Sequence, residues 1–110
     1  MTHSMAWLIL LAAGLLEIVW SVSMKASAGF SRVPLTILTI AAAWASFILL
    51  GIAMKSLPVG SAYAVWTGIG AIGAAILGIV LFDEPVTAAR IGCIGLIVAG
   101  ILGLRLTSGA

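Results

Sequence analysis

The chain has 110 residues, of which 64% are hydrophobic and only 7% are charged, with a formal net charge of +2. Soluble domains carry about 25% charged residues, so this composition excludes an ordinary water-soluble core. It also argues against nucleic-acid binding, because the five Lys and Arg residues are isolated between apolar runs. The single cysteine, Cys93, lies inside such a run, and we expect no disulfide, metal site or cofactor.

Four apolar runs follow one another along the chain, at residues 5–24, 33–54, 57–82 and 86–106. At a rise of about 1.5 Å per residue, each is long enough to cross the roughly 30 Å hydrocarbon region of a bilayer as a helix. A helix is the only open-chain structure that satisfies its own backbone groups there. We therefore predict an all-α membrane protein, with four transmembrane helices in a single domain over residues 1–110.

The residues between the runs are typical of helix ends. We expect Pro34, Pro58 and Pro85 in the first turns of the second, third and fourth helices, where the missing N–H is not needed. Asp83 and Glu84 are expected directly before the fourth helix, at the end where negative charge is favoured.

The first run contains one carboxylate, Glu17, in an otherwise uncharged stretch. Near the membrane midplane a bare charge costs at least about 2.5–3.5 kcal/mol, and an ionisable residue at this depth usually marks an ion or substrate path. The alternative is a protonated glutamate that hydrogen-bonds between helices. We favour the functional interpretation, because no other charge lies so deep. Trp20, three residues later, is expected on the same helix face.

Polar and aromatic residues follow in the second and third runs. The hydroxyl of Ser46 is expected to bond either a carboxylate or its own backbone four residues earlier. Tyr63, Trp66 and Gly70 recur on one helix face, as in a pocket wall that ends where another helix approaches. For Tyr63, an interfacial aromatic belt explains its position equally well.

Glycines and other small residues are frequent in the last two runs. Residues 68–73 read GIGAIG, a literal match to G-x-G-x-x-G, but no strand precedes them and no acidic residue follows at the required spacing. They indicate close packing or a bend in the third helix instead. The fourth run has small residues suited to close helix contact, and it is interpreted as an assembly element. These residues are Gly92, Cys93, Gly95, Ala99, Gly100 and Gly103.

Three segments, LEIVW at 16–20, KSLPVG at 55–60 and AYAVWTGIG at 62–70, resemble the guanidinium-exporter subtype of the small multidrug resistance family. The resemblance extends over about residues 5–107, and only Thr2-His3-Ser4 departs from it, as an extension before the usual start. Trp20 argues against the quaternary-ammonium subtype, which typically has a small or hydroxyl residue near this position.

The resemblance implies a multi-pass protein of the bacterial inner membrane that is not an enzyme and that exports guanidinium and small guanidinyl cations in exchange for protons. Glu17 is then the site shared by proton and substrate, and Gly68 and Gly70 match the hinge of the third helix. The residues that match the lining of the substrate pocket are Trp20, Ser46, Tyr63 and Trp66. Guanidinium can form two parallel hydrogen bonds with a carboxylate. Its faces can stack on indole rings, a contact that contributes about 2 kcal/mol when desolvated.

Other functions stay open. One alternative is a quaternary ammonium or multidrug cation exporter of the same family, and another is a membrane subunit that uses Glu17 only to bind a partner helix. A proton-translocating ring subunit also carries one intramembrane carboxylate, but it needs only a two-helix hairpin and no pair of tryptophans.

Four helices do not both enclose a pocket and change the side to which it opens, so we expect a homodimer. The side with both termini carries Lys55 and Arg105, and the opposite side carries Lys25, Arg32 and Arg90. The difference between two positive charges on one side and three on the other is too small to set one orientation in the membrane. We therefore expect dual topology and an antiparallel pair, in which inverted repeats are divided between two chains. The family resemblance has the same implication.

Overall fold

The computed structural model describes residues 1–107, and the chain forms four helices within them. These are α1 (His3–Ala26), α2 (Val33–Ala53), α3 (Val59–Phe82) and α4 (Ala88–Thr107). All four are long and apolar enough to cross a membrane, which confirms the predicted all-helical, four-span fold. The observed helices differ from the predicted runs by at most two residues at each end.

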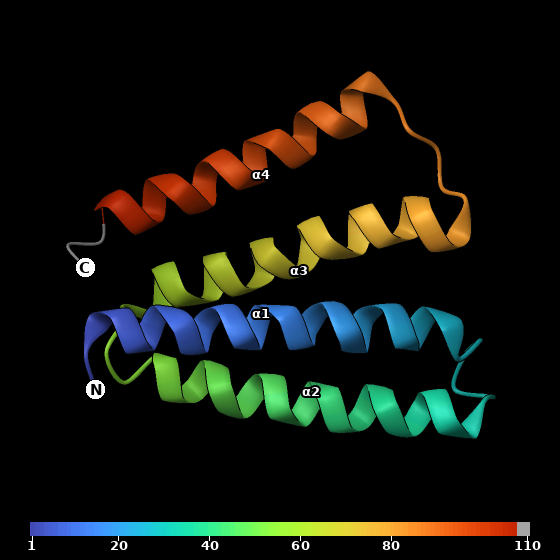
Figure 1. Ribbon diagram of the computed structural model, residues 1–110, viewed down its shortest axis with the longest axis horizontal. Helices are drawn as coiled ribbons and strands as arrows, with labels where there is room; N and C mark the ends of the chain where they lie inside the picture. The colour runs from blue at the N-terminus through green and yellow to red at the C-terminus, as the bar shows by residue number, and fades with distance from the viewer. Residues whose placement is uncertain (108–110) are drawn as a thin grey trace.

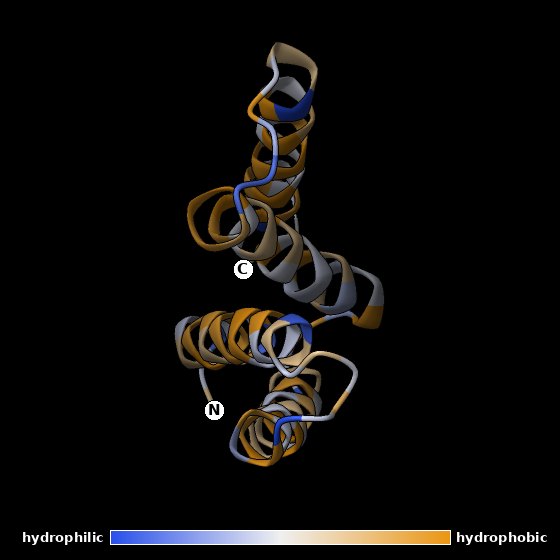
Figure 2. Cartoon of the chain, turned by 90° about the vertical axis from the view of Figure 1, so that its right-hand side faces the viewer, coloured by the Kyte–Doolittle hydropathy of each residue, from blue (hydrophilic) through white to orange (hydrophobic). Residues whose placement is uncertain are grey.

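The helices run alternately up and down, so that the N-terminus, the α2–α3 loop and the end of α4 lie at the same end (Figure 1). Helix α1 packs against both α2 and α3, whereas α4 packs against α3 and leans away from α1. Figure 2 shows the helices mostly in the orange of hydrophobic residues, with the hydrophilic colours gathered near the loops. This distribution is the one required of helices surrounded by lipid.

Caps and prolines define where the first three helices begin. The Oγ1 atom of Thr2 accepts a hydrogen bond of 3.1 Å from the backbone N–H of Met5, which caps α1. Pro34 lies in the first turn of α2, as predicted. Pro58 is the N-cap residue of α3, directly before the first turn.

The expectations for the α3–α4 loop were wrong. Helix α4 begins at Ala88, so Pro85 lies in the loop and not in a first turn. The Thr87 hydroxyl accepts a 3.1 Å hydrogen bond from the backbone N–H of Arg90, and it takes the capping role instead. Asp83 is the C-cap of α3, with a positive φ of 54°. Glu84 forms an ion pair with Arg90, so its charge is directed to a side chain of α4 and not to the helix terminus.

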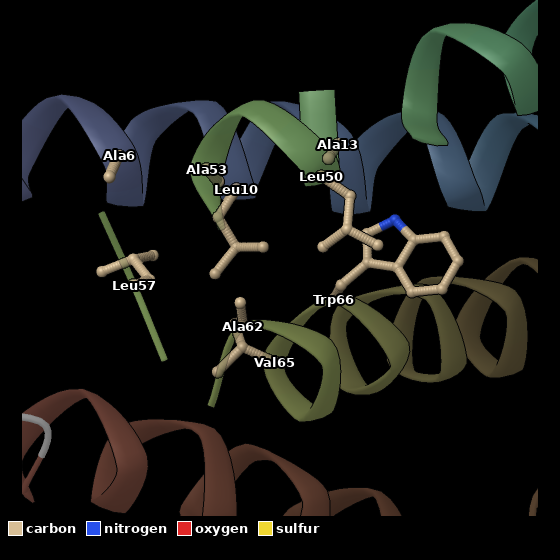
Figure 3. Packing of buried hydrophobic residues seen from close by; sticks show 9 residues of the cluster. All are labelled: Ala6, Leu10, Ala13, Leu50, Ala53, Leu57, Ala62, Val65 and Trp66. Atoms are coloured by element: carbon tan, nitrogen blue, oxygen red, sulfur yellow. The ribbon is translucent and has the colours of Figure 1, made fainter. Parts of the chain in front are cut away.

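The core consists of buried residues from α1, α2, α3 and the α2–α3 loop (Figure 3). They are Ala6, Leu10, Ala13, Leu50, Ala53, Leu57, Ala62, Val65 and Trp66. Four of these nine are alanines, and small residues allow membrane helices to approach each other closely. In the described part of α4, no residue is buried.

The glycines of α4 have open space beside them in the described chain. A Cβ atom added at Gly92, Gly95 or Gly100 would meet no atom within 4 Å, and Cys93 is exposed. Their expected role in dimer packing stays a prediction. By contrast, a Cβ at Gly14 in α1 would lie 2.7 Å from Ile69 in α3, so these two helices depend on glycine for their contact.

We predict that Gly14→Ala lowers the free energy of unfolding by about 1–3 kcal/mol, because the new methyl group would force Ile69 out of its place. Gly51→Ala in α2 is the matched control, since a Cβ there meets no atom within 4 Å. It should leave stability unchanged or raise it by up to about 1 kcal/mol, as expected for alanine in a helix. Unfolding of both variants in detergent measures the difference, and equal stability of the two would contradict the packing described.

Candidate functional site

Glu17 lies near the middle of α1 with its side chain buried, and it is 8% exposed. Its carboxyl group lies against the backbone of α3 at Gly70, where an added Cβ would overlap it. The Oε1 atom of Glu17 is buried and has no hydrogen-bond partner among residues 1–107. Buried polar atoms are nearly always paired, so an unpaired carboxylate oxygen at this depth points to a function.

A cavity of about 540 Å³ lies beside this carboxyl group. Its lining residues come from α1, α2 and α3, and they are Glu17, Trp20, Phe47, Leu50, Tyr63, Trp66 and Thr67. Four of the predicted site residues, Glu17, Trp20, Tyr63 and Trp66, are thus brought together. Among the described residues of this lining, Glu17 is the only one with a carboxyl or basic side chain.

The aromatic residues of the cavity form a continuous series of ring contacts. The Phe47 ring lies edge-on between two indoles, with its centroid 6.2 Å from that of Trp20 and 5.9 Å from that of Trp66. The Tyr63 ring follows at 5.6 Å from Trp66. The negative faces of such rings attract cations. A single carboxylate in an aromatic wall is therefore suited to a small, flat cation.

The hydrogen bonds of Ser46 differ from both expected arrangements. Its Oγ atom donates a 2.7 Å hydrogen bond to the backbone carbonyl of Ala13 in α1 and accepts a 2.9 Å hydrogen bond from Nε1 of Trp66 in α3. It is fully buried and is not part of the cavity lining. A hydroxyl has one proton, and here that proton is directed to Ala13, so Ser46 donates neither to Glu17 nor to its own helix. Ser46 therefore fixes the position of the Trp66 indole by a hydrogen bond, without itself lining the cavity.

The two predicted hinge residues, Gly68 and Gly70, face different neighbours. A Cβ at Gly70 would overlap the Glu17 carboxyl group, whereas a Cβ at Gly68 would lie 2.9 Å from Ile101 and 3.2 Å from Ile97 in α4. Glycine at these two positions therefore lets α3 contact α1 on one side and α4 on the other. A role as a hinge stays a prediction.

The chain was compared with known proteins. The family model described as "Small Multidrug Resistance protein" matches residues 5–97. The chain belongs to the small multidrug resistance family. The resemblance inferred from the segments at 16–20, 55–60 and 62–70 is thereby confirmed.

Three similar family members are named "Guanidinium exporter". That of Yersinia pseudotuberculosis is 61% identical over 104 residues, which cover 94% of this chain and 100% of the relative. Those of Salmonella typhimurium strain LT2 and Citrobacter freundii are 59% and 56% identical over 104 residues, covering 94% of this chain and 99% of each relative. Family membership and the four apolar spans together identify a multi-pass membrane transporter.

In this family member, the sequence patterns missed Phe47, Leu50 and Thr67. Leu50 lies four residues after Ser46 in α2 and so on the same helix face, which was a usable signal. Phe47 is one residue from Ser46 and was hidden in an apolar run that offers no pattern for choosing among its members. Thr67 directly follows Trp66 and was part of the quoted motif.

We predict that Ser46→Ala destabilises the fold by about 1–3 kcal/mol, because the buried Trp66 N–H loses its acceptor. Trp66→Phe removes the same N–H, so the double variant should cost less than the sum of the two single variants. Unfolding of all four proteins in detergent gives this coupling energy. Additive costs would show that the bond between Ser46 and Trp66 contributes nothing to stability.

Proposed function

We propose that this family member exports guanidinium and small guanidinyl cations in exchange for protons, with both ligands competing for Glu17. The observation that carries the proposal is the unpaired, buried Oε1 atom of Glu17 beside a cavity whose described lining has no other carboxyl or basic side chain. The names of the three relatives agree with guanidinium as the substrate.

The proposed substrate suits the chemistry of the cavity. A guanidinium ion donates two parallel hydrogen bonds to a carboxylate, which would provide Oε1 of Glu17 with a donor. The flat faces of the ion would contact the indoles of Trp20 and Trp66, and contacts of this kind contribute about 2 kcal/mol in a desolvated site. Because Trp66 is held by Ser46, its ring needs little ordering when the cation binds.

Exchange follows from competition for one negative charge. A protonated Glu17 has no charge with which to hold the cation, and a cation paired with Glu17 disfavours protonation, because its positive charge stabilises the ionised carboxylate. If the carboxyl group is accessible from only one side at a time, each crossing carries either protons or substrate. Proton entry on one side is thereby coupled to cation exit on the other.

The transporter is proposed to be an antiparallel homodimer of dual topology. The cavity of one chain is open, since Phe47 and Tyr63 in its wall are 48% and 55% exposed. A second copy would cover these rings and bring a second Glu17 to the site. The exposed small residues of α4, Gly92, Cys93, Gly95 and Gly100, are suited to contact between the copies.

Glu17→Gln tests the proposed coupling. This change keeps the volume of the side chain and removes its charge, so guanidinium affinity should fall about 10- to 100-fold and proton-coupled transport should stop. Glu17→Asp retains the carboxylate one methylene further back and should keep partial activity. The measurements are current and substrate-driven proton movement with purified protein in liposomes, with guanidinium and tetraalkylammonium salts compared.

Several results would contradict the proposal. Undiminished proton-coupled current in Glu17→Gln would remove Glu17 from the mechanism. Current with tetraalkylammonium but none with guanidinium would favour the quaternary ammonium alternative. Neither current nor substrate-driven proton movement with the purified wild-type protein would favour a non-transporting subunit.

The pH dependence of substrate binding provides an independent check. Because protonation removes the charge that holds the cation, guanidinium affinity should fall as the pH falls, by up to about tenfold per pH unit once Glu17 is mostly protonated. Titration calorimetry at several pH values measures this slope. An affinity that rises toward low pH would rule out competition at one carboxylate.

Dual topology is tested with a cysteine added at the N-terminus. In intact cells, a membrane-impermeant thiol reagent should label about half of the molecules, because the charge difference between the two sides is too small to set one orientation. Cys93→Ala serves as the background in which the new thiol is the only one. Labelling of all molecules, or of none, would exclude the antiparallel dimer.

A further inference from the structure

A second cavity, of about 560 Å³, is lined by residues of α1, α3 and α4 and lies in a groove between α1 and α4. Val65 and Ile69 of α3 line it between the two outer helices. Leu8 of α1 and Leu102 of α4 also line it and are 66% and 59% exposed, so the groove opens to the surroundings of the helices. In a membrane those surroundings are lipid chains.

The groove exists because α4 packs against α3 and not against α1 (Figures 1 and 2). A cation–π contact connects the two outer helices near their ends. The guanidinium group of Arg105, in the last turn of α4, lies 5.0 Å from the ring centroid of Trp7, in the second turn of α1. Both residues line the groove, as does Ser4. One end of an otherwise apolar groove is therefore polar and positively charged.

The indole of Trp7 has an unused donor. Its Nε1 atom is buried and has no hydrogen-bond partner among residues 1–107. Arg105 does not supply one, because a guanidinium group has only donors. The N–H therefore needs an acceptor from outside the described chain. It lies at the end of the groove that also holds the guanidinium group of Arg105.

The position of this polar end along the membrane normal limits the chemical class of ligand that would bind there. Trp7 and Arg105 lie close to the ends of their helices, at the level where tryptophan and arginine meet lipid headgroups. A ligand with negatively charged acceptor oxygens at this level and an apolar chain reaching toward the midplane has the chemistry of a phospholipid.

We propose that the groove between α1 and α4 binds an anionic phospholipid of the bilayer. Oxygen atoms of its headgroup region accept a hydrogen bond from Nε1 of Trp7 and lie near the positive charge of Arg105. One acyl chain lies along Leu8 and Leu102 and fills the space between the two helices. The bound lipid thus connects α4 to α1, in addition to the contact between Arg105 and Trp7.

The test is a titration of the purified full-length protein in neutral detergent with dioleoylphosphatidylglycerol or dioleoylphosphatidylcholine, with retained lipid counted by native mass spectrometry. Phosphatidylglycerol should be retained more strongly than phosphatidylcholine. Trp7→Phe keeps the ring and removes the N–H, and it should weaken phosphatidylglycerol retention about fivefold. Arg105→Gln should remove most of the preference for the anionic lipid.

Two matched controls come from the same chain. Trp44→Phe changes an indole that is 65% exposed on α2, and Lys55→Gln removes the other positive side chain at the same end of the bundle. Both should retain phosphatidylglycerol as the wild type does. Leu102→Trp fills the groove and should lower retention of both lipids.

The outcomes separate the possible occupants. Equal retention of the two lipids, or retention unaffected by both Trp7→Phe and Arg105→Gln, would overturn the proposal. If Leu102→Trp separates the dimer while lipid retention stays unchanged, the groove is a contact between subunits and the proposal is wrong. Because lipid retention is measured without transport, the result is independent of the proposed export of guanidinium.

Discussion

The arrangement of the first three helices depends on accommodating one carboxyl group in a region where the surrounding lipid provides no hydrogen bond and no opposite charge. A charge near the midplane is costly, and the chain provides few polar contacts to offset that cost. Glu17 is buried between α1 and α3, and the backbone of α3 approaches it closely because residue 70 is glycine. The carboxyl group is thus enclosed by helix packing and left without a donor for Oε1 from the described chain. A polar group held in this way is unfavourable for stability and favourable for binding a proton or a cation.

The polar groups that are satisfied connect the helices around that site. Ser46 joins α2 to the carbonyl of Ala13 in α1 and to the indole of Trp66 in α3. A second buried contact, 2.8 Å between the hydroxyls of Ser23 and Thr39, joins α1 and α2 further along. In a membrane, where apolar side chains gain little by facing one another instead of lipid, such bonds and close packing determine which helix faces meet.

Much of this fold could be predicted from the sequence, because the bilayer sets both the length and the type of a spanning element. The placement of Glu17, Trp20, Tyr63 and Trp66 around one cavity also agrees with their spacing and with the family resemblance. What could not be predicted depends on neighbours that a linear pattern does not contain. The hydrogen-bond partners of Ser46 lie on two other helices. Phe47 has no polar group to distinguish it from its apolar neighbours. At the start of α4, the capping residue is Thr87, and Pro85 lies in the loop before it.

Helix α4 contributes no buried residue in its described part, and no lining residue of the Glu17 cavity belongs to it. During synthesis, the N-terminal segments of a chain become available for folding first. Residues 1–82 contain every described side chain of that cavity and all of the shared core, so both can assemble while the last span is still within the ribosome. The order of the helices along the chain thus separates two steps of biogenesis. The part of the chain that lines the Glu17 cavity is completed first, and the helix with the exposed glycines is added last.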